Sequence, residues 1–249
     1  MMLRVYSNFF FLLLCVLISS CKSFYPTQFS SAVVKVNKTY TPDSSILAFY
    51  HPYKDSIDKI VSIPIVVLET DLTKQLPESS LGNFMVDILR VKATEYTGDT
   101  IDVAILNYGG IRIPSLSKGM LTIQDAYLLM PFENYIVEQV LTGQQISDFC
   151  DSIAMKKGWP ISGMSFRIKN GEAIDIKINN EPLEISRKYK VALNDYIANG
   201  GDGMTFLKAI PQKQTGVLFR EAIIQYWKDQ ALLHLGVTAK TENRISYAE

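Results

Sequence analysis

Apolar positions follow a helical spacing in several segments of the chain. The clearest helix covers residues 81–89, where large apolar side chains recur three and four positions apart after a capping Ser79 or Ser80. The same spacing places Cys150 on the apolar face of a helix that begins after Gly143. Further helices are expected from Asp43 or Ser44 towards Ile60, with a break or kink at Pro52, from Thr122 to just before Pro131, and from about Val217 to Trp227.

Between these helices lie short apolar or alternating runs that predict β-strands. Alternation on both sides of Asn170-Gly171 predicts a β-hairpin over residues 166–178, because Asn-Gly favours the tight turn that joins antiparallel strands. Helices interspersed with strands, together with one antiparallel hairpin, indicate an α/β fold in which helices pack on a mixed β-sheet. The other predicted strands cover residues 63–68, 102–106, 135–141 and 189–193.

The first twenty residues have the pattern of a targeting segment. Arg4 precedes a continuous apolar run from Phe9 to Ile18, which is too short to span a bilayer but typical of a signal peptide. The run ends in Ser19-Ser20-Cys21, which resembles the lipobox of bacterial lipoproteins; the alternative is an ordinary secretory signal that contains a cysteine. The expected organisation is a signal peptide over 1–20, a polar tether over 21–42 that starts at a lipidated Cys21, and a folded domain over 43–249. The lipid would hold the protein to a membrane of the bacterial cell envelope, facing the periplasm.

Composition narrows the possible partners. Hydrophobic residues make up 47% of the chain and charged residues 20%, which is typical of an ordered globular protein. The 25 Lys and Arg residues balance the 25 Asp and Glu residues, so a nucleic-acid duplex is not an expected partner. Cys15 would leave with the signal and Cys21 would carry lipid, so Cys150 has no partner for an intramolecular disulfide. We expect Cys150 to be a small buried hydrophobe rather than a reactive thiol.

Two glycine-rich loops follow predicted strands. In Asn107-Tyr108-Gly109-Gly110-Ile111-Arg112 the glycines permit close approach of a ligand, and Arg112 has the fork geometry for a phosphate. In Asn199-Gly200-Gly201-Asp202-Gly203 the carboxylate of Asp202 is suited to accept from paired ribose hydroxyls. Taken separately, each loop is equally consistent with a structural turn. Phe132 and Tyr196 lie beside loops, where they either pack or stack on a base.

Several kinds of catalytic centre lack support in the sequence. The two histidines, His51 and His234, stand in unrelated contexts, outside any Asp-x-His or Asn-His-Glu pattern. A two-metal phosphohydrolase centre needs a close array of His and carboxylate ligands, so we expect these histidines to be surface or packing residues and the chain to hold no metal or other cofactor. The sequence has neither a P-loop nor a Gly-x-Ser-x-Gly elbow, and no residue is assigned a catalytic role.

Five motifs in order, across about residues 40–246, resemble the C-terminal domain of 5′-nucleotidases and of the related periplasmic nucleotide, UDP-sugar and cyclic-nucleotide hydrolases. Each motif alone is weakly specific, whereas five in the right order are strong. The motifs are Glu78-Ser79-Ser80-Leu81-Gly82-Asn83, Asn107 to Arg112, Pro131-Phe132, Leu141-Thr142-Gly143 and Asp195 to Gly203.

The resemblance implies an α/β domain that binds the base and ribose of a nucleotide. Phe132 and Tyr196 match the two aromatic residues that stack on the base, and Asp202 matches the acid that binds the ribose. The remaining substrate-binding residues that it implies are Asn107, Gly110 and Arg112 in the first glycine-rich loop, and Asn199 and Gly201 in the second.

The chain departs from the family pattern in two ways. Family members often carry a phosphate-binding arginine three positions before the glutamate matched by Glu78, where this chain has Gln75 with Lys74 beside it. A lysine is a point charge and would replace a bidentate arginine imperfectly. In full-length relatives a metal-bearing metallophosphatase domain precedes this domain, whereas here a lipid signal is expected in its place, so divalent metals are expected only in a separate catalytic partner.

Three functions remain open at this stage. The chain is the substrate-binding half of a split 5′-nucleotidase, a stand-alone nucleoside- or nucleotide-binding lipoprotein, or a degenerate relic. The presence of Phe132, Tyr196, Asp202 and Arg112 argues against a relic. Because every base has a π-face, a ring sandwich leaves the base preference open, and the sequence also leaves open whether the ligand is a 5′-nucleotide, a cyclic nucleotide or a sugar nucleotide.

Overall fold

The computed structural model describes residues 31–35, 37 and 40–249, which fall into two units that divide between Tyr50 and His51. Helix α2 (Ser44–Val61) spans this division and begins after Asp43, whose carboxylate accepts from the backbone of Ser45 at 2.8 Å. The predicted start is confirmed. A break or a kink was expected at Pro52, and the helix continues through this residue without a break. The proposed signal peptide, Cys21 and the first part of the tether lie outside the described residues.

A five-stranded mixed sheet forms the centre of the second unit, in the order β12-β6-β11-β3-β7. Strands β3 and β11 are parallel neighbours, and the other pairs are antiparallel. Along β3, Val103 and Ile105 face one hydrophobic core while Ala104 faces the other, because successive side chains of a strand point to opposite faces. The strand bounds are β3 Val103–Ile105, β6 Tyr135–Thr142, β7 Ile161–Ser162, β11 Lys188–Asn194 and β12 Gln212–Leu218.

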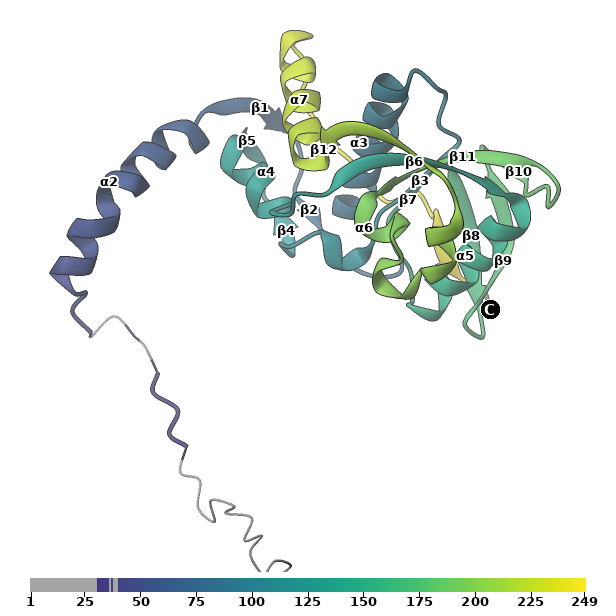
Figure 1. The fold of residues 1–249 in the computed structure, drawn as a ribbon, viewed down its shortest axis with the longest axis horizontal. Helices are drawn as coiled ribbons and strands as arrows, with labels where there is room; N and C mark the ends of the chain where they lie inside the picture. The colour runs from purple at the N-terminus through teal and green to yellow at the C-terminus, as the bar shows by residue number, and fades with distance from the viewer. Residues whose placement is uncertain (1–30, 36, 38–39) are drawn as a thin grey trace, which may run out of the picture. The chain divides into compact units, whose positions relative to one another are not determined.

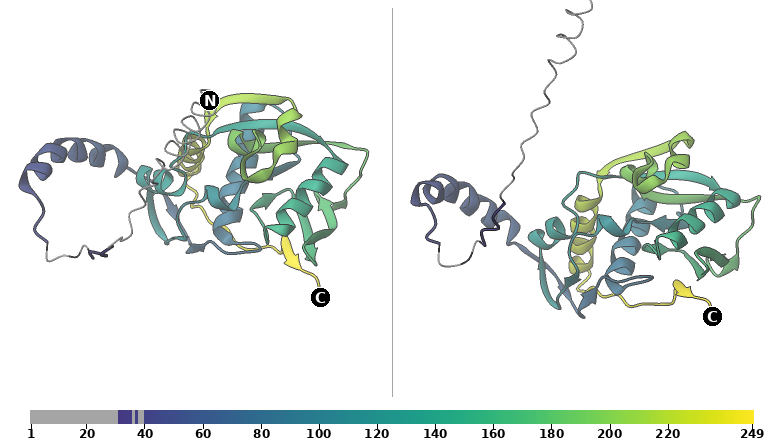
Figure 2. Two further views of the ribbon diagram at one scale, coloured as in Figure 1. Left: turned by 60° about the horizontal axis from the view of Figure 1, so that its bottom comes forward. Right: turned by 90° about the horizontal axis from the view of Figure 1, so that it is seen from below.

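Helices cover both faces of this sheet (Figures 1 and 2). Helices α3 (Ser80–Thr97) and α7 (Phe219–Leu232) pack in one core, and α5 (Gly143–Met155) packs in the other. The predicted α/β fold with a mixed sheet is thereby confirmed.

The helix starts follow from local capping. The side chain of Ser79 accepts from Gly82 N at 3.0 Å at the start of α3, as expected from the sequence. Thr122 and Asp125 form a capping box before α4 (Ile123–Leu129), which ends ahead of Pro131 as predicted. The last helix begins at Phe219 rather than near Val217, because the preceding residues pair with β6 as part of β12.

A second sheet, in the order β10-β9-β8-β13, packs with α5. The predicted hairpin consists of β8 (Met164–Lys169) and β9 (Glu172–Ile178), and Asn170 and Gly171 both have positive φ, as a tight type I′ turn requires. Strand β10 (Glu181–Pro182) extends one edge. Strand β13 (Ile245–Tyr247), the yellow arrow next to the C-terminus in Figure 2, pairs in parallel with β8 at the other edge.

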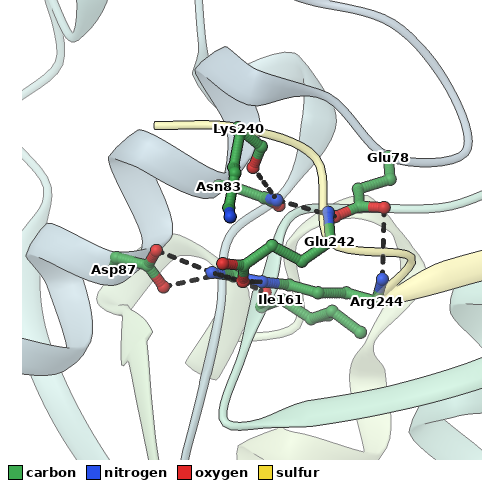
Figure 3. Close-up of polar contacts among 7 residues, drawn as sticks. All are labelled: Glu78, Asn83, Asp87, Ile161, Lys240, Glu242 and Arg244. Carbon is green, nitrogen blue, oxygen red and sulfur yellow. Dashed lines mark hydrogen bonds and ion pairs between the residues drawn. The ribbon is translucent and has the colours of Figure 1, made fainter. Parts of the chain in front are cut away.

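The C-terminal segment is held by partly buried polar contacts to α3 and to the residues just before it (Figure 3). Arg244 makes two hydrogen bonds of 2.7 Å to Asp87 and donates to the carbonyl of Ile161 at 2.9 Å. Glu78 accepts from the backbone of Glu242 and of Arg244 at 2.8 and 3.1 Å. The last strand therefore depends on charged side chains as well as on strand pairing.

Two small antiparallel pairs complete the fold. Strand β1 (Pro64–Leu68), predicted from the sequence, pairs with β5 (Gly119–Thr122), and β2 (Leu72–Thr73) pairs with β4 (Ser115–Leu116). Together β4, β5 and α4 carry the chain from the first glycine-rich loop to Phe132, so they fix the distance between these two parts of the candidate site.

Candidate functional site

A cleft of about 360 Å³ opens beside the central sheet. Because β3 and β11 are parallel neighbours, their carboxyl ends lie together, and the loops that follow them meet at the same edge. The loop after α4 closes the cleft from another side. The lining residues are Asn107, Gly109, Gly110, Arg112, Phe132, Asn134, Tyr196 and Asp202.

Asn107 joins the two glycine-rich loops. Its Nδ2 donates to Asp202 Oδ2 at 2.9 Å, and its Oδ1 accepts from Asn194 Nδ2 at 3.3 Å. Asn194 is fully buried, and its own Oδ1 accepts from Ile197 N at 2.9 Å to cap the short helix α6 (Asp195–Ala198). Asn194 thus orients Asn107, which in turn orients the carboxylate of Asp202. The sequence analysis missed this role of Asn194, although an asparagine between a strand and a helix is a capping signal.

Asp202 and Tyr196 hold each other in place. The phenolic hydroxyl of Tyr196 lies 3.1 Å from Asp202 Oδ1, and the backbone N–H of Asp202 donates to the same hydroxyl at 3.3 Å. Asp202 has a φ of +52°, a conformation that aspartate tolerates better than most residues. A Cβ at Gly201 would lie 2.5 Å from the tyrosine ring, so this loop position needs glycine.

Each Asp202 oxygen is therefore held by one donor of the protein. A carboxylate oxygen has about two lone-pair sites, so each still has capacity for a donor from a ligand. The carboxylate is exposed to solvent and fixed in direction, which is the arrangement needed to accept from two neighbouring hydroxyl groups.

Phe132 and Tyr196 supply exposed aromatic surface to the same cleft, with 39% and 45% of each residue accessible. The guanidinium of Arg112 lies 5.6 Å from the centroid of the Phe132 ring, and its Nη1 donates to Gly109 O at 3.3 Å. A Cβ at Gly110 would lie 2.8 Å from Asn107 Oδ1, so this glycine is required by the position of the asparagine.

Lys74 lies beside this loop but is not part of the cleft lining. Its Nζ donates to Ile111 O at 2.7 Å and sits 4.0 Å from the centroid of the Tyr108 ring. Burial and the positive charge of Arg112 both lower the pKa of Lys74. Two cations thus lie near each other, which favours an anion at this end of the cleft. In the part of the chain that the structure describes, no carboxylate forms an ion pair with Arg112.

Six of the eight predicted binding residues line the cleft, and two do not. Asn199 and Gly201 line a neighbouring hollow of about 450 Å³, which shares Tyr196 and Asn134 with the cleft. Asn199 Oδ1 accepts from Gln212 Nε2 at 3.0 Å, which ties its side chain to β12. Asn134 lines both spaces and was not predicted, because a lone asparagine two positions after Phe132 carries no motif.

Two motifs of the resemblance support the fold rather than the cleft. Glu78 and Asn83 bind each other at 2.7 Å, and Asn83 also donates to Lys240 O at 2.9 Å, so they secure the C-terminal segment. At Thr142-Gly143, the threonine caps α5, and a Cβ on Gly143 would lie 2.1 Å from Glu184 O.

The cysteine and the histidines of the described part of the chain lie outside the cleft. Cys150 is fully buried, its pKa is raised by burial, and Met164 Sδ lies 3.5 Å from its Sγ, so the expected packing role is confirmed. His51 and His234 are exposed. Over residues 31–35, 37 and 40–249, no three His, Cys, Asp or Glu side chains come together in a way that would hold a metal ion.

Comparison with known proteins supports this architecture. Residues 61–209 match the family model of the 5′-nucleotidase C-terminal domain. A 5′-nucleotidase of Vibrio parahaemolyticus is 26% identical over 207 residues, which cover 78% of this chain and 35% of the relative. Protein UshA of Escherichia coli is 31% identical over 144 residues, covering 55% of this chain and 26% of the relative. The chain therefore spans about a third or less of these relatives.

Solved structures agree with the sequence matches. The crystal structure of a 5′-nucleotidase precursor from Thermus thermophilus superimposes with a TM-score of 0.69 at 27% identity, covering 83% of this chain and 43% of that one. An NAD nucleotidase from Haemophilus influenzae has the same fold, with a TM-score of 0.63 at 20% identity, covering 83% of this chain and 42% of that one.

Proposed function

Because the chain belongs to the 5′-nucleotidase C-terminal domain family, we propose that it binds the base, ribose and phosphate of a nucleotide as the substrate-binding half of a split 5′-nucleotidase. Hydrolysis of the phosphomonoester would be carried out by a separate metallophosphatase that supplies the divalent metals. The observation that carries this proposal is one cleft that combines two exposed aromatic rings, a fixed carboxylate and an exposed arginine.

Each part of a nucleotide has a matching group in this cleft. A base stacking on Phe132 and Tyr196 would lose water from its faces, and such stacking contributes ~1–3 kcal/mol per base. Asp202 would accept from the two ribose hydroxyls, while Asn107 keeps its carboxylate oriented. Arg112 would bind the phosphate as a fork, and the charge of Lys74 beside it would add to the attraction.

Removing Arg112 should weaken the binding of nucleotides much more than the binding of nucleosides. Arg112→Ala is expected to weaken AMP about ten- to a hundredfold, because a charge-assisted hydrogen bond contributes ~1.5–3 kcal/mol, and to leave adenosine within about twofold. Isothermal titration calorimetry of both ligands measures this. Lys118→Ala, which removes an exposed cation outside the cleft, is the matched control. Equal losses for AMP and adenosine would remove Arg112 from the phosphate subsite.

Catalysis should require a second protein. We expect the purified chain to release no phosphate from AMP or UDP-sugars with added Mn²⁺, Zn²⁺ or Co²⁺, because two-metal hydrolysis needs ligands that hold ions about 3.5–4 Å apart. If an adjacent reading frame encodes a metallophosphatase with Asp-x-His and Asn-His-Glu motifs, adding that protein should give release of phosphate from AMP. Robust metal-dependent turnover by the chain alone, with copurifying phosphatases excluded, would contradict the split-enzyme proposal.

The second candidate is a stand-alone binding protein that captures nucleosides or nucleotides without hydrolysis. It is favoured by the same cleft, because none of the binding groups needs a metal. Two results distinguish the candidates. A stand-alone protein binds AMP with the same affinity whether or not the metallophosphatase is present, and a mixture of the two proteins shows no turnover of AMP.

Location is a separate proposal that rests on the N-terminal sequence. Among the described residues, no helix is both long and apolar enough to cross a membrane. We propose lipid anchoring at Cys21 in the bacterial cell envelope, facing the periplasm. Cys21→Ser is expected to move the protein to the soluble fraction or to block its maturation, because it removes the residue that carries the lipid. Stable membrane attachment takes more than one acyl chain, and the variant would have none at this position. Membrane fractionation with size analysis checks this, and a variant that stays in the membrane at wild-type size would contradict it.

A further inference from the structure

A buried arginine contacts the segment that carries Phe132, which together with Tyr196 forms the aromatic wall of the cleft. Arg220 is the second residue of α7, and only 8% of its side chain is exposed. It does not line the cleft, and no motif marks it in the sequence. A guanidinium is rarely buried unless it is paired, so the position needs a physical reason.

The contacts of Arg220 lead to Phe132. Its Nη1 donates to the carbonyl of Phe132 at 3.3 Å, and its guanidinium carbon lies 4.2 Å from the centroid of the Tyr127 ring. Glu221 forms an ion pair with Arg220, with Oε1 3.6 Å from Nε, but half of the glutamate side chain is exposed. Nε itself is buried and has no hydrogen-bond partner in the described part of the chain.

This set of contacts is poor compensation for a buried charge. Desolvation of a guanidinium is costly, and an apolar side chain of similar volume often serves stability as well as or better than a buried ion pair. The arginine is therefore poorly explained by stability alone. Among the residues that the structure describes, its one side-chain hydrogen bond goes to the backbone of Phe132, which carries the stacking ring.

A second contact from the same helix end holds the same segment. The backbone N–H of Phe219 donates to Asn134 O at 2.8 Å, and Leu218 pairs with Tyr135 across β12 and β6. The start of α7 thus binds the 132–134 segment at both of its ends. That segment places Phe132 and Asn134 in the cleft.

We propose that Arg220 is a positioning residue, which fixes the backbone of Phe132 so that its ring is held in the stacking position before the ligand arrives. The proposal rests on the proposed nucleotide-binding function of the cleft. Because the segment is already ordered in the free protein, binding does not have to include the entropy cost of ordering it. The affinity for ligands that contain a base is therefore higher.

A double-mutant cycle with two ligands tests this in the full chain. Arg220→Met keeps much of the buried volume and removes the donor. It is expected to weaken AMP about three- to tenfold and to leave ribose 5-phosphate unchanged, because only AMP stacks on the ring. In the Phe132→Ala background, Arg220→Met should cause no further loss of AMP affinity. Glu221→Gln, which leaves the arginine in place, is the matched control and should bind AMP as the wild type does.

A measurement without ligand separates this proposal from the function on which it rests. Hydrogen–deuterium exchange of the amides in residues 131–135 should be faster in Arg220→Met and unchanged in Glu221→Gln. If wild-type protein fails to bind AMP, the proposed function falls, while the exchange result still decides whether Arg220 orders the segment.

Three results would overturn the positioning role: equal losses for AMP and ribose 5-phosphate, additive losses in the Phe132→Ala background, or unchanged exchange in residues 131–135. If Arg220→Met does not fold, Arg220→Lys takes its place, because it keeps the charge but has neither the fork nor the reach of the arginine.

Discussion

Asp202→Ala is expected to lower the affinity for adenosine about ten- to a hundredfold, while free adenine binds almost as before. A hydrogen bond to a charged group contributes ~1.5–3 kcal/mol, and the carboxylate is positioned to accept from both ribose hydroxyls. Free adenine has no ribose hydroxyls, so it loses none of these hydrogen bonds when the carboxylate is removed. Calorimetric titration of adenosine and adenine measures the difference.

The ligand provides the control for this experiment. 2′,3′-Dideoxyadenosine has the base but not the hydroxyls, so it should bind wild-type protein and Asp202→Ala with nearly equal affinity. Asp202→Asn keeps the shape of the side chain and one acceptor, so its affinity for adenosine should lie between those of the wild type and Asp202→Ala. If Asp202→Ala weakens adenosine and its dideoxy analogue equally, the residue acts by holding Tyr196 rather than by binding the ribose.

The second large effect concerns stability. Arg244→Met is expected to lower the free energy of unfolding by about 2–4 kcal/mol, because it leaves Asp87 without its partner and removes the donor to Ile161 O. The expected loss of stability is smaller than for a fully buried ion pair, because 42% of the Asp87 side chain is exposed to solvent. A chain of this size loses ~2–4 °C of melting temperature per kcal/mol, so the change is large enough to measure by calorimetry.

An exposed ion pair of the same chemistry serves as the matched control. Arg167 and Asp175 pair across the hairpin with about half of each side chain accessible. Arg167→Met should therefore change the free energy of unfolding by less than ~1 kcal/mol. If both variants lose the same stability, the contacts of the C-terminal segment to α3 do not depend on Arg244.

Local signals in the sequence predict the elements that they control. Ser79 caps α3, and Asn170-Gly171 forms the hairpin turn, because capping and turn formation depend on neighbouring residues alone. Strand β12 was missed because its residues Gln212 to Gln214 are polar, and its pairing with β6 is a long-range interaction. Pro52 was expected to break or kink the first helix, which continues through it without a break.

The candidate site shows the same limit. Residues in family motifs, such as Phe132 and Asp202, are found in one cleft as the resemblance implied. Asn199 lies in an equally good motif, but its side chain binds Gln212 and lines the neighbouring hollow. Asn134 and Arg220 have no motif, and only the fold brings them to the aromatic wall. Sequence patterns thus identified the candidate binding groups but not the residues that hold them.

The most direct test of nucleotide binding in this cleft is a titration of the isotope-labelled protein with AMP, followed by backbone NMR. We expect saturable shifts concentrated in residues 107–112, 132–134 and 196–202, with little change in the β8–β9 hairpin. Absence of shifts at millimolar AMP, or saturable shifts confined to other residues, would contradict it. Because the catalytic partner is proposed to act on the bound ligand, a negative result is repeated with the metallophosphatase present, and a second negative result rejects the site.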